Sequence, residues 1–413
     1  MPSGVLFVHN NFPAQFRDLA LTLKARGVRC AAIGQDFAPG IEGMAMGRYG
    51  LDRGSTPGMF PLAVRAEADM IRGANALRVA KSMRDQGFDP AVIIGHPGWG
   101  ETVFLDEAWP AAKRVAFAEF YYRGRGLDIG FDPEFFKPSE QSVLLGKAKN
   151  AVMTMAYAEA DVIVAPTEFQ ASILPSVFRP RVRIIHEGVD VDAIRPGPAE
   201  PFALDEGRAI APGTPVITYA NNHMEPMRGL HIFARALPRL MSEVPDAQVL
   251  VFGWENPRPY GGQPPEGRTW REVFFEGLDV DPARLHFLGR RPHDQMLAAF
   301  RLSTAHVYYT YPFVLSWSLV EAMASGCYII GSDTPPLHDA ITDGVSGRLL
   351  PFFDVEALSD AMIAACRHPA AATALRAAAR DTAVTKFSSR DGREAWLATL
   401  RELGVEIPDA PPA

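Results

Sequence analysis

Short apolar runs alternate with helix-length segments along most of this chain, and the alternation starts twice. In the first series the strand-length runs lie at residues 5–8, 28–33, 91–94, 114–117, 162–165 and 182–185. In the second series they lie at residues 215–220, 248–252, 285–288, 306–309 and 328–331. Between the two series stands the run RPGPAEP at residues 195–201, which continues neither a helix nor a central strand. This pattern predicts two α/β domains with parallel sheets, joined by a proline-rich linker.

The predicted boundaries divide the 413 residues into four parts. They are an N-terminal Rossmann-like domain at 1–195, a linker at 196–212, a C-terminal Rossmann-like domain at 213–388, and a final helix with a tail at 389–413. Ligands of such sheets bind outside the carboxyl ends of the strands, so we expect a site in a cleft between two facing halves.

Composition narrows the class of protein. A hydrophobic content of 47% with 22% charged residues is typical of a globular chain, and a net charge of −7 gives no overall attraction to nucleic acid. The three cysteines are far apart, without the spacing of a zinc site or a disulfide framework. The N-terminus lacks a basic signal-peptide start, and no apolar run approaches the ~18 residues of a membrane span. We therefore expect a cytoplasmic protein. The basic run at 179–183 leaves open a peripheral contact with anionic lipid at the inner face of the membrane.

A strand, a polar turn and a helix follow one another at residues 307–324. Ser316, Trp317 and Ser318 precede the helix-forming run 319–324, so a helix starting there presents unpaired N–H groups and a positive dipole end to a ligand. Glu321 lies in the first turns, where its carboxylate can accept hydrogen bonds from a ribose diol. An ordinary βαβ unit without a ligand is the alternative.

The run EAMASG at 321–326 resembles the donor-site helix of the GT-B glycosyltransferases of family 4, in which E-x7-E is followed by A-M-A-x-G. Phe313 stands where the first glutamate of that motif falls. The run HNNFPAQF at 9–16 is similar to the N-terminal region of one subgroup, associated with bacterial surface glycans. The resemblance implies the GT-B architecture: two Rossmann-like domains facing across a cleft, with the last helix crossing back to the first domain.

Two further loops of the second half fit the same family. Residues 222–229 (NHMEPMRG) are similar to its R-x-M-E-P-x-R-G loop, so Arg228 is expected to neutralise the leaving phosphate, while Asn222 replaces the first arginine. Losing that one charged hydrogen bond costs roughly 1.5–3 kcal/mol, which weakens catalysis without abolishing it. In the run LGRRP at 288–292, the resemblance implies that Gly289, Arg290 and Arg291 frame the nucleobase. A solvated loop cation is the alternative for Arg228.

Polar residues follow the first strands of the N-terminal half. Asn10 and Asn11 occupy the position of a Gly-Gly loop in many GT-B proteins, and Asn10 is the better ligand candidate because Asn11 can act as a helix N-cap. His96, in the loop GHPGWGE at 95–101, matches the family's first-domain histidine near the reacting sugar. Glu101 ends that loop and is expected on the acceptor side. A structural histidine is the alternative for His96.

Two aromatic stretches, EFYY at 119–122 and GFDPEF at 130–135, resemble segments of the same subgroup. Aromatic rings cover the apolar face of a sugar and carboxylates accept its hydroxyls, so Glu119, Tyr121 and Tyr122 are expected on the acceptor side. A loop that packs on itself is the alternative.

The resemblance therefore implies a retaining glycosyltransferase that uses a UDP- or GDP-linked sugar and a glycan, lipid-linked or protein acceptor. His96, Arg228 and Glu321 form the expected catalytic set, and Arg228 with the amides at 316–318 meets the charge on the leaving diphosphate. No metal or other cofactor is expected, because the D-x-D runs at 190–192 and 279–281 fit turns. A nucleotide-sugar-binding protein without transfer activity is the main alternative, motivated by Phe313 and Asn222. A sugar-nucleotide epimerase or a phosphorylase is a weaker one.

Overall fold

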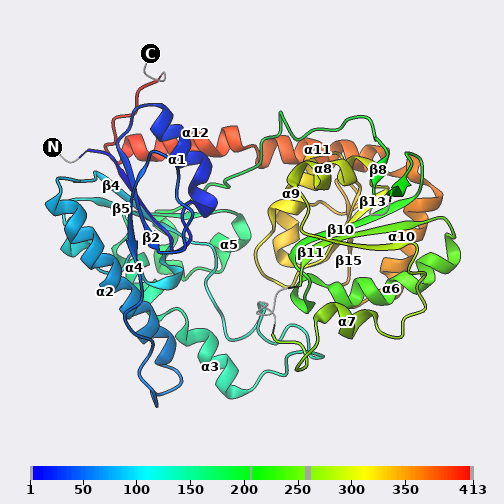
Figure 1. Ribbon diagram of the computed structural model, residues 1–413, viewed down its shortest axis with the longest axis horizontal. Helices are drawn as coiled ribbons and strands as arrows, with labels where there is room; N and C mark the ends of the chain where they lie inside the picture. Colours follow the sequence, from blue (N-terminus) through cyan, green and yellow to red (C-terminus); the bar gives the residue numbers. More distant parts are fainter. Residues whose placement is uncertain (1–2, 205–206, 256–261, 410–413) are drawn as a thin grey trace. The chain divides into compact units, whose positions relative to one another are not determined.

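The computed structural model describes residues 3–204, 207–255 and 262–409. Residues 205–206 of the predicted linker and 410–413 of the predicted tail lie outside the described residues. The chain forms two compact units, each an α/β layer structure of the Rossmann type that the sequence predicts (Figure 1). Unit 1 consists of Met1–Ile129, Pro138–Glu187 and Ser389–Ala413, and unit 2 of Gly130–Lys137 and Gly188–Ser388.

Unit 1 is built on a seven-stranded parallel sheet with the order β3-β2-β1-β4-β5-β6-β7. Its strands are β1 (Val5–Val8), β2 (Cys30–Gln35), β3 (Ala45–Tyr49), β4 (Val92–Gly95), β5 (Lys113–Phe117), β6 (Val162–Ala165) and β7 (Val182–Ile184). Its helices are α1 (Arg17–Ala25), α2 (Val64–Asp85), α3 (Glu140–Ala148), α4 (Ala151–Glu159), α5 (Glu168–Ser172) and α12 (Ser389–Glu402). Leu23 of α1 and Leu397 of α12 share one apolar core with β1, and Ala76 of α2 belongs to the core on the other face. The central strands are continuously apolar because both faces of the sheet are covered.

Unit 2 has a six-stranded parallel sheet with the order β12-β11-β10-β13-β14-β15. Its strands are β10 (Val216–His223), β11 (Gln248–Trp254), β12 (Leu285–Gly289), β13 (Ala305–Tyr308), β14 (Ile329–Ser332) and β15 (Arg348–Leu350). Its helices are α6 (Leu230–Glu243), α7 (Trp270–Phe275), α8 (His293–Leu302), α9 (Trp317–Ala324), α10 (Val355–Arg367) and α11 (Thr373–Lys386). In Figure 1, α8, α9 and α11 cover one face of the sheet, and α6, α7 and α10 lie toward the other. A small hairpin of β8 (Phe202–Ala203) and β9 (Ala209–Ile210) lies within the predicted linker.

Two edge strands, β3 and β15, were absent from the sequence prediction. Each lies at the outer end of its sheet and is only partly buried. Edge strands lack the continuous apolar run that marks a strand buried on both faces, so the pattern that identified the central strands does not detect them.

In both sheets the strand order reverses beside the first strand, between β1 and β4 in unit 1 and between β10 and β13 in unit 2. In open α/β sheets, ligands bind at such a switch point, outside the carboxyl ends of the strands. The loops after these four strands are therefore where functional side chains are expected.

The Gly130–Lys137 segment belongs to unit 2, although we expected residues 1–195 to form the first domain. Its Phe131 ring lies 5.0 Å from Tyr311 and 5.4 Å from Phe353, and its Phe135 ring lies 5.3 Å from Trp270. These rings pack against other aromatic residues of unit 2. The expectation that aromatic rings of the GFDPEF stretch bind a sugar is therefore not supported.

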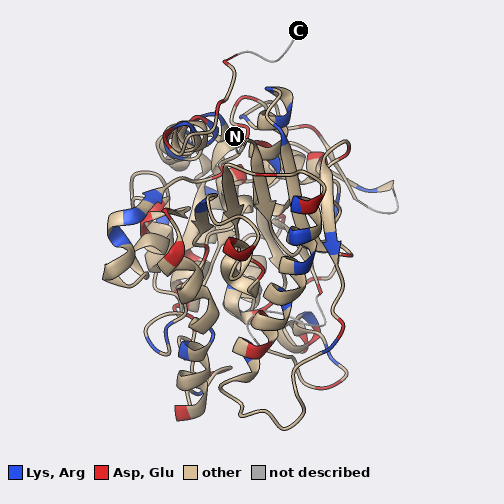
Figure 2. Cartoon of the chain, turned by 90° about the vertical axis from the view of Figure 1, so that its left-hand side faces the viewer, with Lys and Arg blue, Asp and Glu red and all other residues tan. Residues whose placement is uncertain are grey.

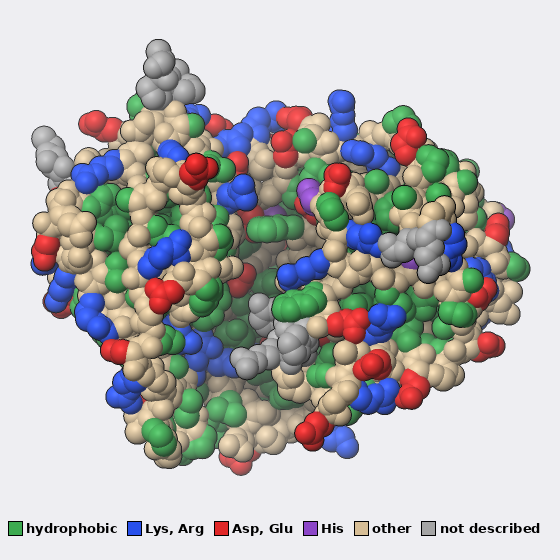
Figure 3. Space-filling view, in the orientation of Figure 1, with side chains coloured by type: hydrophobic (Ala, Val, Ile, Leu, Met, Phe, Trp, Pro, Cys, Tyr) green, Lys and Arg blue, Asp and Glu red, His purple; other side chains and the backbone are tan. Residues whose placement is uncertain are grey.

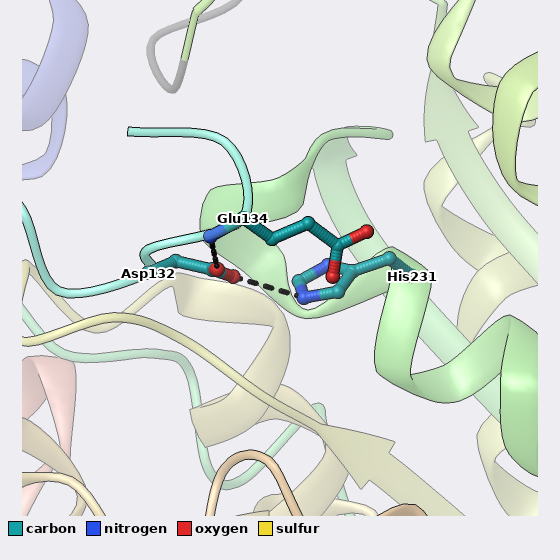
Figure 4. A group of neighbouring side chains, drawn as sticks. All are labelled: Asp132, Glu134 and His231. Atoms are coloured by element: carbon teal, nitrogen blue, oxygen red, sulfur yellow. Dashed lines mark hydrogen bonds and ion pairs between the residues drawn. The ribbon is translucent and has the colours of Figure 1, made fainter. Parts of the chain in front are cut away.

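Polar contacts fix the same segment (Figure 4). Asp132, which is 1% exposed, accepts a hydrogen bond from Tyr311 at 2.9 Å and pairs with His231 of α6 at 3.0 Å. Glu134 forms a two-fold ion pair with Arg235. Asp132, Glu134 and His231 are ligand types that a metal ion uses, but both carboxylates are already engaged by protein donors. The geometry is that of an anchor for the segment.

Charges on the surface are mixed in sign. Figures 2 and 3 show Lys and Arg interspersed with Asp and Glu on the sides they display. None of the described helices combines the length and the apolar character needed to cross a bilayer.

Asp132→Asn is expected to lower the stability of unit 2. Burial disfavours the Asp132 carboxylate, but hydrogen bonds from His231, the Glu134 amide and Tyr311 outweigh it, so the pKa of Asp132 is lowered. The expected loss is about 1–3 kcal/mol, seen as a lower Tm in calorimetry of the full chain. Because the pKa of Asp132 is lower in the folded than in the unfolded state, its carboxylate stabilises the fold in full above a pH of about 3.9. The difference in stability between the variant and the wild type should therefore shrink as the pH falls below that value.

Glu134→Gln is the matched control, because the side chains of Glu134 and Arg235 are 44% and 42% exposed. Removing this surface pair should cost only about 0–1 kcal/mol. Equal losses for the two variants would contradict the view that the buried Asp132 is the anchor.

Candidate functional site

Arg228 is the central polar residue at the switch point of unit 2. It ends a short 3-10 helix, Pro226–Arg228, after β10, and it is 9% exposed. Its Nη1 donates to the Thr310 hydroxyl and the Val314 carbonyl, both at 3.0 Å, and to the Tyr308 hydroxyl at 3.4 Å. Within the described residues all its acceptors are neutral, and the ion pairs found there do not include it. A buried guanidinium without a counter-charge is costly, and a bound anion would relieve that cost.

β13, the turn after it and α9 follow one another as the strand, turn and helix that the sequence predicts. The Ser316 amide donates to the Tyr308 hydroxyl at 2.8 Å, and Ser316 then serves as the N-cap residue of α9. The Ser316 and Ser318 hydroxyls lie 2.7 Å apart, and Ser318 donates to the Ala220 carbonyl at 2.8 Å. These bonds fix the positive end of α9 against the end of β10, close to Arg228. Ser316 makes no side-chain bond to the first turn of the helix, and Trp317 is 47% exposed.

Glu321 lies in the first turns of α9, with a side chain that is 13% exposed. One carboxylate oxygen is 2.7 Å from Nε2 of His293, the first residue of α8. Burial raises the pKa of Glu321, and His293 opposes that rise. Glu321 was predicted from the sequence but His293 was not, because nothing in the chain pattern shows that α8 and α9 bring the two together.

The predicted base-binding loop follows β12. Gly289 has φ +61°, and a Cβ added there would have no atom within 4 Å among the described residues. Arg290 stacks over the Trp254 ring at 4.4 Å and donates to the Asn222 side-chain oxygen at 3.3 Å. Arg291 donates to the Leu288 carbonyl at 3.3 Å. The structure thus brings Asn222 and Arg290 together, as a common donor site requires, but one face of Arg290 is already taken by a tryptophan.

Trp254 was not predicted as a site residue from the sequence. It ends β11 and is 41% exposed, which is unusual for so large an apolar side chain. The available signal was a tryptophan two residues after the predicted strand at 248–252.

In unit 1, His96 lies at the switch point after β4 and is 5% exposed. Its Nδ1 accepts from the Gly98 amide at 3.1 Å, and its Nε2 lies 3.3 Å from a Glu119 carboxylate oxygen. Its ring packs 4.4 Å from Trp99 and 5.3 Å from His9. Burial, followed by the nearby His96, lowers the pKa of His9 to about 3, so the His9 ring is neutral near pH 7. The predicted residues His96 and Glu119 are thereby brought into direct contact.

The two asparagines after β1 differ in their surroundings. Asn11 is exposed, its amide donates to His9 Nδ1 at 2.9 Å, and the N-cap residue of the following 3-10 helix is Pro13. The expected N-cap role of Asn11 is therefore wrong. The side-chain oxygen of Asn10 is buried and accepts no hydrogen bond within the described residues. Asn10 therefore stays the better ligand candidate.

Glu101, which we expected on the acceptor side, is a buried residue. It is 0% exposed and accepts a hydrogen bond from the Tyr49 hydroxyl at 2.5 Å. Burial raises its pKa. The sequence pattern did not reveal this because burial beneath the loop depends on β3, the edge strand that was also missed.

Tyr121 and Tyr122 are half-buried against the start of α4. The Tyr121 hydroxyl lies 3.1 Å from the Thr154 hydroxyl, and Lys149 lies 4.5 Å above the Tyr122 ring. This geometry favours the self-packing alternative for the two tyrosines, whereas the Glu119 side chain is 41% exposed.

Two family models match the chain. Residues 26–194 match a model described as "Glycosyl transferase family 4 group", and residues 214–368 match one described as "Glycosyl transferases group 1". The chain belongs to the group 1 glycosyltransferases of family 4. The narrower subgroup suggested by the HNNFPAQF run stays a prediction.

Curated relatives of this glycosyltransferase include two D-inositol 3-phosphate glycosyltransferases. That of Nocardia farcinica is 26% identical over 208 residues, covering 50% of this chain and 45% of the relative. That of Mycobacterium tuberculosis is 28% identical over 249 residues, covering 59% of this chain and 49% of the relative. The matches thus span about half the length of these proteins.

Solved structures similar to this glycosyltransferase cover nearly all of it. Sucrose-phosphate synthase from Thermosynechococcus elongatus has a TM-score of 0.73 at 17% identity and covers 97% of this chain and 99% of its own. Anabaena HepE in complex with UDP-glucose has a TM-score of 0.66 at 14% identity and covers 97% of this chain and 100% of its own. The likeness confirms the predicted GT-B fold.

Gly229→Ala is expected to disturb the Arg228 loop. Gly229 has φ +68°, and a Cβ there would lie 2.4 Å from the Cβ of Tyr309. A left-handed alanine costs about 1–2 kcal/mol, and the clash adds to that cost. Gly277→Ala is the matched control, because Gly277 has φ +72° and no atom within 4 Å of the added Cβ. The Tm should fall further for Gly229→Ala, and equal shifts would contradict the steric argument.

Proposed function

We propose that this chain transfers a sugar from a nucleotide-sugar donor to an acceptor hydroxyl, and that unit 2 binds the diphosphate of the donor. The observation that carries the proposal is Arg228, a buried cation with neutral partners beside the start of α9. The UDP-glucose complex of Anabaena HepE, which shares the fold, supports a UDP-linked donor. A GDP-linked donor is the second option.

In this proposal, the bond from the anomeric carbon to the diphosphate breaks while a bond to the acceptor oxygen forms on the same face. The acceptor proton passes to the departing phosphate, so configuration is retained and no protein nucleophile is needed. Arg228 and the first amides of α9 stabilise the negative charge that develops on the diphosphate. Glu321 accepts hydrogen bonds from the ribose, and Gly289, Arg290, Arg291 and Asn222 surround the base.

On the acceptor side we propose roles for unit 1. Asn10 has a buried oxygen without a hydrogen-bond partner in the described residues, and His96 with Glu119 forms a polar pair in the loop after β4. These groups would orient the sugar or the acceptor hydroxyl. We further propose that the enzyme acts in bacterial surface glycan synthesis, in the cytoplasm at the inner face of the membrane.

A second candidate function is nucleotide-sugar binding without transfer. Phe313 replaces a glutamate of the family motif, and its ring centroid lies 5.7 Å from the Arg228 guanidinium carbon. An apolar ring there supplies no hydrogen bond to a sugar. An assay can distinguish transfer from binding alone. It measures the release of nucleoside diphosphate from UDP-, GDP- and ADP-sugars, with a bacterial membrane extract as acceptor. A donor that binds but never turns over favours the binding protein.

Arg228→Gln should weaken nucleotide binding. The loss of a charged hydrogen bond corresponds to about a 10- to 150-fold weaker Kd for the nucleoside diphosphate that the wild type prefers among UDP, GDP and ADP. The Tm without ligand should also fall, because the acceptors of Arg228 in the loop after β13 lose a buried donor. Calorimetric titration and thermal shift measure the two quantities.

Arg380→Gln is the control for this variant. Among the described residues, Arg380 also donates to neutral oxygens, the carbonyls of Val191, Ile194 and Ala324. This variant should lower the Tm and leave nucleotide affinity within about twofold of wild type. Undiminished nucleotide affinity in Arg228→Gln would overturn the proposed diphosphate site.

Nucleotide affinity should not depend on a divalent metal. The proposal assigns the positive charge at the diphosphate to Arg228 and the α9 amides, so titrations with EDTA and with magnesium should give Kd values within about twofold. Binding that is lost in EDTA and restored by magnesium would contradict the metal-free mechanism.

A further inference from the structure

The contact between His293 and Glu321 joins two elements of unit 2 that the proposed donor site uses separately. His293 begins α8 and directly follows the base loop, and Glu321 belongs to α9. The distance between Nε2 and the carboxylate oxygen is 2.7 Å. His293 is 56% exposed and Glu321 is 13% exposed, so the contact lies where a buried carboxylate meets the surface.

Binding a ribose diol makes two demands on a carboxylate. It must be ionised, because a carboxylate accepts at both oxygens, whereas a protonated carboxyl uses one oxygen as a donor. It must also be held in one orientation, since a side chain that rotates freely loses entropy when it binds. A hydrogen bond from a neighbouring donor meets both demands.

We propose that His293 is a positioning residue for the donor ribose, holding the Glu321 carboxylate in the orientation that accepts the two ribose hydroxyls. This inference rests on the proposed function and adds a residue to it. His293 acts through Glu321 and through its place after the base loop, so it also ties the position of that loop to the ribose acceptor.

The neighbouring elements offer no equivalent partner among the described residues. Arg380 of α11 contacts α9 but donates to the Ala324 carbonyl at the far end of that helix. His223 of β10 faces Arg228 and Arg290, whose charges, after burial, lower its pKa. Burial raises the pKa of Glu321, and His293 is the one charged or titratable neighbour in the described chain that alters it.

The test compares four variants with wild type: His293→Ala, His293→Gln, Glu321→Ala and His338→Ala. His338 is the matched control, because it also is 56% exposed and also pairs with a carboxylate, Asp333, at 2.7 Å. Each protein is titrated with UDP, GDP and ADP. The nucleotide that wild type binds most tightly is then used with its 2′-deoxy and 3′-deoxy forms.

We expect His293→Ala to bind the ribonucleotide about 10-fold more weakly than wild type, and Glu321→Ala at least as weakly. His293→Gln should recover most of the affinity, since its amide also donates. For the 2′-deoxy or 3′-deoxy nucleotide the effect of His293→Ala should shrink, because a hydroxyl through which the histidine acts is missing. His338→Ala should match wild type.

The pH profile gives a readout that a merely structural role would not move. Nucleotide binding requires ionised Glu321, so affinity falls as the pH drops through its pKa. Removing His293 removes the group that opposes the raised pKa, so the acid limb should move to higher pH in His293→Ala. His293→Gln should show a smaller shift.

The outcomes distinguish the proposed role of His293 from the proposed donor site. Weak binding by Glu321→Ala with wild-type binding by His293→Ala overturns the role of His293 and leaves the donor site standing. The same holds if His293→Ala weakens ribo- and deoxynucleotides equally, or if His338→Ala has the same effect. Wild-type affinity in Glu321→Ala, or no binding of any of the three nucleotides by wild type, overturns the proposed donor site itself.

Discussion

The buried guanidinium of Arg228 is the interaction on which the geometry of the switch point in unit 2 depends. It comes from the loop after β10 and donates to Thr310 and Val314, which belong to the loop after β13. One side chain therefore joins the two loops at the point where the strand order reverses. Because its partners are neutral oxygens, they do not balance the charge of Arg228, and the side chain lies in a setting with little water, where electrostatic attraction to an anion is strongest.

Tyr308 connects this cation to the start of α9. Its hydroxyl oxygen accepts from Arg228 at 3.4 Å and from the Ser316 amide at 2.8 Å. Tyr308 is 0% exposed, so the position of its hydroxyl is set by the core beneath β13. The cation and the helix terminus are thus oriented by the same rigid ring, which fixes both before any ligand arrives. Such preorganisation is the usual source of electrostatic stabilisation in enzymes.

The sequence was sufficient for features that depend on local pattern. Central strands, the start of α9 and the loop position of Arg228 follow from apolar runs, cap residues and strand-end loops, and each was predicted. Features that depend on contacts distant in sequence were missed or wrong. Glu101 was predicted only as an acceptor-side loop residue, and its buried hydrogen bond comes from Tyr49, on an edge strand that was not predicted. His293 reads like an ordinary helix start, and its pairing with Glu321 arises only when α8 and α9 pack together.

The division of the chain has a consequence for synthesis on the ribosome. The backbone passes from one unit to the other at four points, after residues 129, 137, 187 and 388. Neither unit is a contiguous stretch, so cutting the gene at the linker would leave each product without a segment of its own unit. Trp396 and Leu397 of α12 belong to the apolar core around β1. The apolar core of unit 1 is therefore complete only after α12 has been translated.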